Sequence, residues 1–313
     1  MAEIGIVIVT FFSETEIGPC LDAVLGAGSD VVVVDNGSHD GTVAEVARRG
    51  VRLIANTANR GFAAAVNQGV TVLKSSYVLL LNPDAVLQGG LQRLREACDL
   101  PGAAGAGGRL VDSAGQLQAG FMVRALPTPA ALILEALLLN RLWPNNPVNR
   151  RYRGLGLDYS ARMVVEQPAG AFLMIRRAVW EELGGFDEGF RPLWFEDVDF
   201  CRRAMDRGYL LYYEPGAVAK HTGGHSISKI GVELRPVYWY SNLLRYTVRH
   251  FRPSAFRAVC IAVLSGALPR AAAESAVGRS LKPLTAYWKV ARLASRCLVF
   301  GWRDEVVLQG PND

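Results

Sequence analysis

The chain has 313 residues, of which 50% are hydrophobic and only 20% are charged. This composition excludes an intrinsically disordered protein, and the length suits one large domain or one domain with an appendage. The formal net charge of +5 is unevenly distributed, because residues 245–303 hold eleven Lys and Arg against one acid, Glu274. The remainder of the chain therefore carries a formal charge of about −5.

The first half of the chain alternates short apolar runs with helical patterns. Strands are predicted at 4–10, 31–36, 51–56 and 77–82. Helices are predicted between them, ending near Leu25 after the first strand and then covering 41–49 and 61–74. Strands that are apolar throughout and alternate with helices predict an α/β fold, with a mostly parallel central sheet and helices on both faces.

Polar residues follow these strands where ligands of a parallel sheet bind, beyond the carboxyl ends. They are Thr10, Asp35, Asn56 to Gly61, and Asn82 to Asp84. Asp35 can accept hydrogen bonds from a ribose or a pyrimidine, although DNGSHDG is also a common turn sequence. The first strand continues into TFFSETEIG, without the G-x-G-x-x-G or G-x-x-x-x-G-K-[ST] pattern, so NAD and P-loop nucleotide sites lose their main support.

Two residues from different strand ends suit a hard divalent cation. Asp84 closes the fourth strand within Asn82-Pro83-Asp84, and His221 ends a later strand-like run, YLLYYEPGAVAKH. A carboxylate and an imidazole can form part of a coordination shell that phosphate oxygens and water complete. The alternatives are an ordinary turn for Asp84 and an ordinary loop residue for His221. Two glycines between His221 and His225 argue against a zinc-binding helix.

The stretch FRPLWFEDVDFCRRAMDRG gathers Glu196, Asp197 and Asp199 directly behind Trp194 and Phe195. Clustered carboxylates repel one another unless a cation, a proton or a helix N-terminus offsets them. One interpretation is a helix start, since acidic residues favour the first turn. The other is a catalytic site, in which the aromatic rings desolvate a carboxylate and raise its basicity.

The basic C-terminal segment mixes Lys and Arg with aromatic and aliphatic residues at helix-like spacing. This pattern favours amphipathic helices at an anionic membrane surface and does not favour a nucleic-acid partner. The longest uncharged run, 258–268, is too short to span a bilayer. The alternative is that these helices cover the catalytic domain or form a homodimer. The N-terminus shows no basic leader, and the five scattered cysteines suit reduced thiols, so we expect a cytoplasmic protein at the inner face of the membrane.

Seven motifs together resemble glycosyltransferase family 2, in its rhamnosyltransferase-like branch. In chain order they are IVIVTFF, VVVVDNGSHDGT, NRGFAAAVNQG, LLLNPDA, PAGAFLMIRRAVWEELGGFDEGF, WFEDVDFCRRA and KHTGGHS. The resemblance covers about residues 4–228 and implies the GT-A fold, which is Rossmann-like, with a C-terminal helical extension. We expect a catalytic domain at 1–230, an insertion of unassigned role at 121–160, and a membrane-associating or oligomerising region at 231–313.

The resemblance also implies roles for single residues. Asp197 would be the catalytic base of the ED motif, Asp84 and His221 would be metal ligands, and Trp194 and Glu196 would contact the acceptor. The remaining residues would bind the donor nucleotide: Thr10, Asp35, Asn59, Gly61, Asn67 and Asn82. Asn82 stands where the family's DxD motif begins with Asp, which lowers the local negative charge.

The function implied is an inverting, metal-dependent sugar transfer in cell-surface polysaccharide synthesis, with Mg²⁺ or Mn²⁺ as cofactor. The donor would be a dTDP- or UDP-linked sugar, with rhamnose as one candidate, and the acceptor a saccharide or lipid-linked saccharide. Two alternatives are a sugar nucleotidyltransferase and a non-catalytic sugar-nucleotide-binding protein. The first lacks a glycine-rich triphosphate loop at TFFSETEIG, and the second would not need Asp197.

Overall fold

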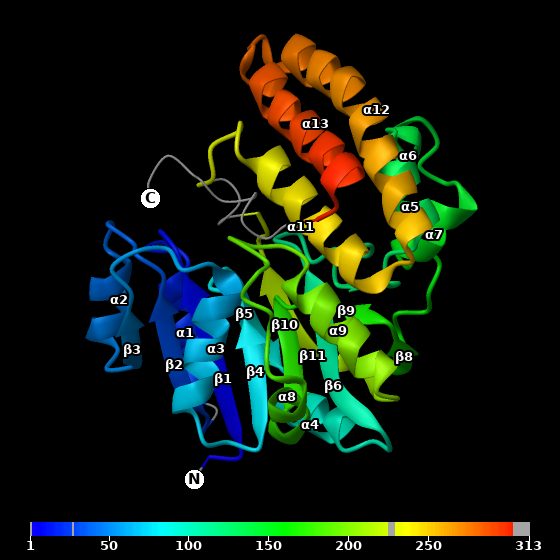
Figure 1. The fold of residues 1–313 in the computed structure, drawn as a ribbon. Coiled ribbons are helices and arrows are strands. Elements are labelled where there is room, and N and C mark those ends of the chain that lie inside the picture. Colours follow the sequence, from blue (N-terminus) through cyan, green and yellow to red (C-terminus); the bar gives the residue numbers. More distant parts are fainter. Residues whose placement is uncertain (1, 27, 225–228, 303–313) are drawn as a thin grey trace. The chain divides into compact units, whose positions relative to one another are not determined.

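The chain divides into two compact units in the computed structural model, which describes residues 2–26, 28–224 and 229–302 (Figure 1). The first unit comprises 1–126, 153–188 and 196–229. The second comprises 127–152, 189–195 and 230–313. The chain thus passes from one unit to the other five times, and one of these crossings lies between Phe195 and Glu196.

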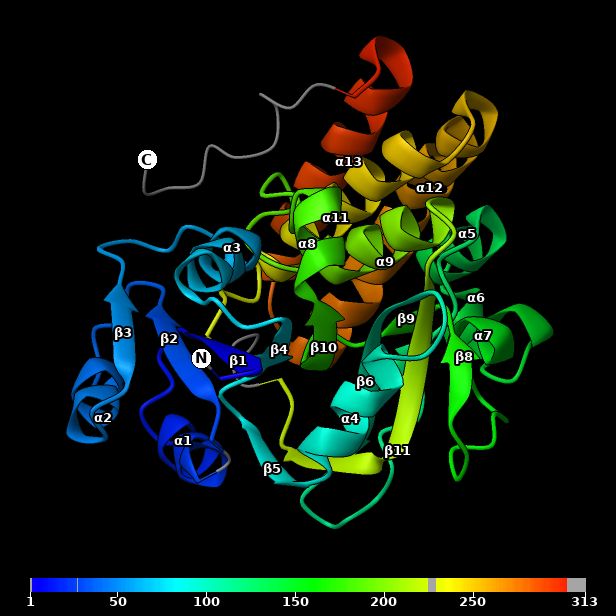
Figure 2. The same ribbon diagram turned by 90° about the horizontal axis from the view of Figure 1, so that it is seen from below.

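The first unit is an α/β unit built on a nine-stranded sheet, with the strand order β3-β2-β1-β4-β10-β6-β11-β5 and with β8 paired to β11 (Figure 2). A two-stranded sheet joins β7 and β9. The strands are β1 Ile4–Thr10, β2 Asp30–Asp35, β3 Arg52–Ala55, β4 Tyr77–Leu81, β5 Ala85–Gly89, β6 Ala103–Val111, β7 Val123–Arg124, β8 Met163–Val165, β9 Gln167–Pro168, β10 Phe172–Arg176 and β11 Leu210–His221. The helices are α1 Ile17–Leu25, α2 Thr42–Arg48, α3 Phe62–Val72, α4 Leu91–Cys98, α8 Arg177–Leu183 and α9 Glu196–Asp206.

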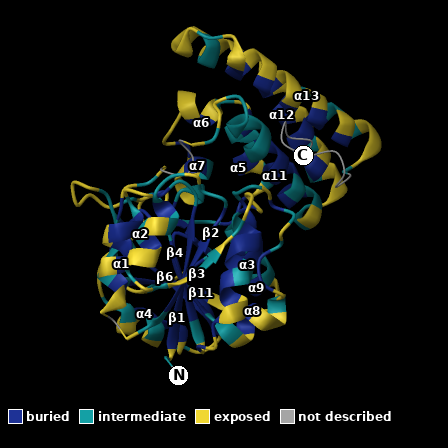
Figure 3. Ribbon diagram, turned by 90° about the vertical axis from the view of Figure 1, so that its left-hand side faces the viewer, coloured by how far each residue is buried: buried dark blue, intermediate teal, exposed yellow. Residues whose placement is uncertain are grey.

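The central strands are apolar throughout because helices cover both faces of the sheet, as predicted. Ile6 and Ile8 of β1 pack in the cluster that includes α1 and α4. Val7 and Val9 pack in the other cluster, together with α3 and Trp180 of α8. Successive side chains of a strand point to opposite faces, so each face receives every second residue. Figure 3 shows these central strands as the buried part of the unit.

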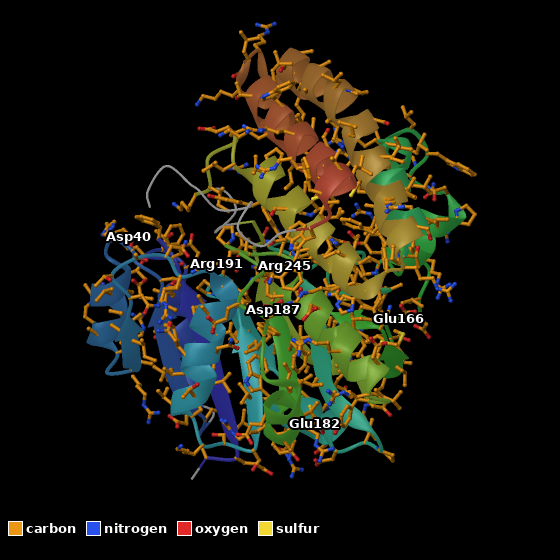
Figure 4. The ribbon with its side chains drawn as sticks, in the orientation of Figure 1. Asp40, Glu166, Glu182, Asp187, Arg191 and Arg245 are labelled. Carbon is orange, nitrogen blue, oxygen red and sulfur yellow. The ribbon has the colours of Figure 1, made fainter. Side chains whose placement is uncertain are left out.

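The sheet is parallel from β3 to β4 and mixed beyond it. β1 pairs in parallel with β2 and β4, whereas β10 runs antiparallel between β4 and β6. β11 runs parallel to β6, so that β1, β2, β4 and β11 all end at the same edge of the sheet. Asp40 lies toward this carboxyl edge and Glu182 toward the opposite end of the sheet (Figure 4). The predicted site residues at the ends of these strands therefore share one edge.

The second unit is helical. It contains α5 Pro129–Ala136, α6 Leu139–Leu142, α7 Pro147–Tyr152, α11 Arg235–His250, α12 Pro253–Gly278 and α13 Lys282–Phe300. α12 packs along α13 and against α5, and Gly266 of α12 allows this contact, since a Cβ there would lie 1.9 Å from the Ala136 carbonyl oxygen. Buried Arg270 of α12 forms an ion pair with Glu135.

Part of the segment that we expected to be an insertion thus packs with the C-terminal helices. Residues 127–152 and 189–195 join the helical unit, although both lie within the range predicted for the catalytic domain. Periodicity identifies helices, but it does not say which distant segment a helix packs against. The five cysteines are buried and free, in keeping with the predicted reduced thiols.

Candidate active site

The ends of β1 and β2 form a buried polar cluster around Asp35. Thr10 donates from Oγ1 to Asp35 Oδ1 at 2.9 Å, and Ser38 donates from Oγ to the same atom at 2.6 Å. The Ser38 amide donates to Asp35 Oδ2 at 2.9 Å. Hydrogen bonds from Ser38 therefore hold the turn after β2 against Asp35, the last residue of that strand. Ser38 belongs to this polar cluster, and we did not single it out from the sequence. The turn expected at DNGSHDG was the signal that could have identified it.

A group of side-chain and backbone amides lies beside this polar cluster. Asn36 donates to Asn59 Oδ1 at 2.8 Å, and the Gly61 amide donates to the same oxygen at 2.9 Å. Gly61 has φ of 90°, a conformation that favours glycine, and it precedes the first residue of α3. The structure thus brings Asn59 and Gly61 together, next to Asn36, which directly follows Asp35.

Asn67 of α3 contacts the backbone of Phe186, and its predicted role in donor binding stays a prediction. Its side chain donates to the Phe186 carbonyl at 3.0 Å and accepts from the Phe186 amide at 3.1 Å. This two-point contact ties α3 to the loop after α8. Among the described residues, no hydrogen bond links the Asn67 side chain to Asn59 or Gly61.

The ends of β4 and β11 bring Asp84 and His221 together. Asp84 Oδ1 lies 3.4 Å from His221 Nε2, and both side chains are buried. The Gly223 amide donates to Asp84 Oδ2 at 3.0 Å. Burial alone would raise the pKa of Asp84, but the contacts with His221 and Gly223 outweigh it and lower that pKa below its usual range. Asn82 joins the group, with its Nδ2 3.5 Å from His221 Nε2.

Gln118 fixes the orientation of the His221 ring. Its Nε2 donates to the His221 carbonyl at 2.9 Å, so its Oε1, 2.9 Å from His221 Nδ1, must accept a hydrogen bond from that ring nitrogen. Phe121 stacks on the same ring, with centroids 5.1 Å apart. Nδ1 is therefore the protonated nitrogen, and Nε2 faces Asp84, where it can take a proton or a cation. Sequence reasoning missed Gln118, because nothing in its local sequence marks it.

The acidic cluster forms the first turn of α9. Asp199 is fully buried and pairs with Arg203 at 2.7 Å, which is a structural role. Asp197 accepts hydrogen bonds from the amides of Gly170 at 2.9 Å and Val198 at 2.8 Å, and from Gln167 Nε2 at 3.2 Å. The helix-start interpretation therefore describes Asp199, which pairs with Arg203 within α9. Asp197 is held by donors from the segment around Gly170, and its catalytic role stays a prediction.

Burial governs the protonation of the two adjacent acids, Glu196 and Asp197. Burial raises the pKa of Asp197, while the amides of Gly170 and Val198 oppose the shift. Burial and the neighbouring Asp197 raise the pKa of Glu196 well above its usual range. Oε2 of Glu196 is buried without a hydrogen-bond partner among the described residues. Asp197 is thus the acid whose ionised form the surrounding donors stabilise.

Trp194 and Phe195 precede this turn and belong to the helical unit. Both have positive φ, 79° and 74°, a conformation that costs a non-glycine residue on the order of 1–3 kcal/mol. α11 fixes the same loop, because Asn242 donates to the carbonyls of Arg191 and Leu193 at 3.0 and 2.8 Å. Arg245, labelled in Figure 4, lies over the Phe190 ring at 5.6 Å.

Two features limit what this edge can bind by itself. Within 2–26, 28–224 and 229–302, no group of three or more His, Cys, Asp or Glu side chains is arranged to hold a metal ion. The last two residues of the KHTGGHS motif, 225 and 226, lie outside the described residues. Among the described residues, Asp84 and His221 therefore supply two candidate ligands, and a cation there would take further oxygens from a bound substrate or water.

Comparisons with known proteins agree with this arrangement. The sequence model of the family described as "Glycosyl transferase family 2" matches residues 5–181. The chain is 31% identical over 248 residues, 70% of this chain and 79% of the relative, to N-acetylglucosaminyl-diphospho-decaprenol L-rhamnosyltransferase of Mycobacterium tuberculosis. A shorter match, 36% over 62 residues, covers 20% of this chain and 23% of the rhamnosyltransferase WbbL of Escherichia coli.

One solved structure is similar in fold. It is the mannosyltransferase PcManGT from Pyrobaculum calidifontis in complex with GDP-Man and Mn²⁺, with a TM-score of 0.54 at 16% identity. The match covers 96% of this chain and 88% of the other. At this identity the likeness concerns the fold, an α/β unit of the glycosyltransferase type accompanied by helices.

Proposed function

The chain belongs to glycosyl transferase family 2, and on that premise we propose that it transfers rhamnose from a nucleoside diphosphate to a lipid-linked saccharide. It is a glycosyltransferase with an α/β fold, similar to enzymes that build cell-wall polysaccharide. The sugar, the nucleoside and the acceptor are the proposed part. They rest on the 31% identical relative, whose name states an L-rhamnosyl transfer to a decaprenol-linked acceptor.

One observation carries the proposal. Asp35, the Asp84–His221 pair and the segment that holds Asp197 all belong to one edge of one sheet. The polar cluster around Thr10 and Asp35 would bind the nucleotide base and ribose, and the neighbouring end of β4 would bind the diphosphate. A base for the acceptor hydroxyl has to lie beyond the diphosphate, on the side of the sugar, and Asp197 is our candidate. The donor would be linked to dTDP or UDP.

We propose that Asp84 and His221 hold a divalent cation, Mg²⁺ or Mn²⁺. The residues fit this role, since a carboxylate and an imidazole nitrogen face each other at 3.4 Å and the other ring nitrogen is already bonded to Gln118. Sites of this type commonly use one or two protein ligands together with substrate phosphates. When bound, the cation would stabilise the charge of the departing diphosphate.

The reaction would invert the anomeric carbon in one displacement. The acceptor hydroxyl oxygen bonds to the anomeric carbon while the bond from that carbon to the diphosphate oxygen breaks, and the hydroxyl proton passes to Asp197. The products are the glycoside, the nucleoside diphosphate and the protonated carboxyl. Glu196 and Trp194 are proposed to contact the acceptor.

The exposed side of the hairpin formed by α12 and α13 supports the proposed membrane contact. We call it the hairpin surface and define it as Val277, Arg279, Leu281, Lys282, Leu284, Trp288, Lys289, Arg292, Arg296, Val299 and Phe300, all of them exposed. Trp288 is 70% exposed and Leu281 74%. Residues 279–302 contain no acid, and Glu274 of α12 is bonded to Tyr287.

Apolar and basic side chains without acids suit the interface of an anionic leaflet. A second copy of the same surface would bring like charges together, which makes a homodimer through it the weaker alternative. α12 has the length and composition of a membrane span, but half of its apolar window is buried, as in a packed helix. We therefore propose a cytoplasmic enzyme, peripheral at the inner face of the membrane, where a lipid-linked acceptor is accessible.

A screen of sugar nucleotides tests the proposal. Thermal stabilisation and slow hydrolysis are measured for dTDP-rhamnose, UDP-sugars and GDP-mannose, with and without Mg²⁺ or Mn²⁺, and transfer to a polyprenyl-diphosphate saccharide is then assayed. We expect dTDP-rhamnose to stabilise and to be transferred. Synthesis of a sugar nucleotide from a sugar phosphate and a nucleoside triphosphate would instead identify a nucleotidyltransferase. Binding without transfer to any saccharide would identify a sugar-nucleotide-binding protein.

A further inference from the structure

Three hydrogen-bond donors hold the Asp197 carboxylate, and they are divided unequally between its two oxygens. Gln167 Nε2 and the Gly170 amide both donate to Oδ2, at 3.2 and 2.9 Å. Among the residues that the structure describes, Oδ1 accepts only from the Val198 amide, at 2.8 Å. An ionised carboxylate has about four acceptor positions, two on each oxygen. Oδ2 is therefore saturated, and Oδ1 keeps one position open.

From this count we propose that Oδ1 of Asp197 is the atom that receives the acceptor proton and that Gln167 is a positioning residue for it. The inference rests on the proposed function, in which Asp197 is the base. The proton leaves the acceptor hydroxyl as its oxygen bonds to the anomeric carbon, and the nucleoside diphosphate departs with the electron pair of the broken bond. Oδ2, which already accepts from two donors, would anchor the carboxylate during this step.

The two donors on Oδ2 are themselves fixed. Gln167 is buried and also donates to the Pro168 carbonyl at 3.2 Å, so its amide has little freedom to turn. Gly170 lies so close to the helix that a Cβ would be 3.2 Å from Asp197 Cβ and 3.3 Å from Oδ2. Glycine is thus the residue that lets the backbone amide reach the carboxylate without displacing it.

The same segment connects the base to the end of β4. The Ala171 carbonyl accepts at 3.0 Å from the amide of Asn82, which lies two residues before Asp84. On its other side, the Ala169 amide donates to the Met122 carbonyl at 2.9 Å. The sequence QPAGAF, residues 167–172, therefore holds Asp197 at one point and the strand end that carries Asp84 at another. It sets the separation between the base and the proposed diphosphate site.

Several charged or titratable groups surround Asp197 and influence the pH at which it ionises. Glu196 lies next to it in the chain, Arg124 of β7 acts on it as a positive charge, and buried Cys201 and Asp199 lie on the same helix. Burial disfavours the ionised carboxylate, and donated hydrogen bonds favour it. Removal of the Gln167 amide should therefore raise the pH at which Asp197 becomes ionised.

The test is Gln167→Met, which keeps the volume and removes the donor. We expect kcat to fall about tenfold, because the carboxylate loses its alignment, with the donor KM unchanged. The acidic limb of the kcat profile should move up by about one pH unit, as expected for the loss of one hydrogen bond to a charged group. Gln167→Asn, whose amide is one methylene too short, should shift the limb in the same direction and serves as the second variant if the methionine variant does not fold.

Val165→Ala is the matched control. Val165 is buried in the neighbouring strand β8 and does not touch Asp197, so this variant should lower the melting temperature without moving the pH profile. A Gln167→Met enzyme that slows only as much as Val165→Ala, with an unmoved acidic limb, would overturn the positioning role. Asp197→Asn is assayed alongside. If it retains turnover, the proposed base itself is wrong; if it is inactive while Gln167→Met behaves as wild type, only the positioning role is wrong.

Discussion

The carboxyl edge of the α/β unit and the hairpin surface of the helical unit differ in which side chains they bury. At the edge, Asp35, Asp84 and His221 are almost completely buried, and other side chains or backbone amides hold each of them. The hairpin surface instead exposes apolar side chains, since Trp288 and Leu281 are largely accessible to solvent beside exposed basic side chains. Fixed polar groups can select a small charged ligand, whereas mobile basic chains and exposed apolar groups suit an extended surface.

This difference predicts that substitutions at the carboxyl edge change turnover or cation binding. Substitutions on the hairpin surface should instead change binding to the membrane. Asp197→Asn should show the largest effect. We expect a loss on the order of a hundredfold or more in kcat, because general-base catalysis is typically worth that much. Donor affinity should change little, since in the proposed mechanism this carboxylate contacts the acceptor and not the donor. Steady-state kinetics with a soluble acceptor measure both, and a variant that loses donor affinity while keeping its turnover would contradict the assignment.

Asp84→Ala and His221→Ala test the proposed cation ligands. Each should weaken the binding of Mn²⁺ in the presence of nucleoside diphosphate by tens of fold, because each removes one of two protein ligands. Electron paramagnetic resonance of free Mn²⁺ gives the affinity without an activity assay. Gln116→Leu, at an exposed position outside the proposed pair, is the control. A normal Mn²⁺ isotherm in both ligand variants would remove this site from the mechanism.

Gln118→Leu tests how far the buried partners matter beyond the ligands themselves. The leucine removes the acceptor for His221 Nδ1 and leaves both proposed ligands in place. We expect about a tenfold loss in Mn²⁺ affinity, the lower end of what such supporting contacts contribute. Gln116→Leu, an exposed glutamine two residues earlier, is the matched control. Equal Mn²⁺ affinity in the two variants would show that the ring needs no support from Gln118.

Arg292→Gln should have the smallest effect, and on a different observable. A basic residue near an anionic leaflet contributes about 1 kcal/mol, so the affinity for liposomes with anionic lipid should fall about fivefold. Arg48→Gln makes the same change at an exposed position of α2 and should leave cosedimentation unaltered. Turnover with a soluble acceptor should be normal in both. Binding that ignores the anionic lipid content would leave the hairpin surface as a packing or dimer element.

The sequence predicted the sheet better than it predicted the division of the chain. The four apolar runs of the first half became β1 to β4, because continuous apolar strands have few other ways to be buried. Asp84 and His221 could be paired in advance, since both end strands. The antiparallel insertion of β10 and the assignment of 127–152 to the helical unit depend on contacts between distant segments. No local pattern encodes them.

The same distinction holds within the site. Thr10, Asp35, Asp84 and Asp197 stand out because a strand end or a charge cluster marks them. Gln118 and Gln167 do not, since an isolated glutamine in a sequence is indistinguishable from a surface residue until its partners are known. Asn67 lies in a family motif and also contacts the Phe186 backbone, and its role in donor binding stays a prediction. Motifs mark conspicuous residue types, and the hydrogen bonds that hold those residues become visible in the folded chain.

The repeated passage of the chain between the two units constrains how the protein can be dissected or recombined. A deletion after residue 230 would remove α11, α12 and α13 but leave 127–152 and 189–195 behind, with their apolar side chains uncovered. Asn242, which fixes the loop just before Glu196, would also be lost. A chimaera that exchanged only the C-terminal region between relatives would break the same contacts. The unit of exchange is therefore the whole chain, and specificity for an acceptor cannot be transplanted as a tail.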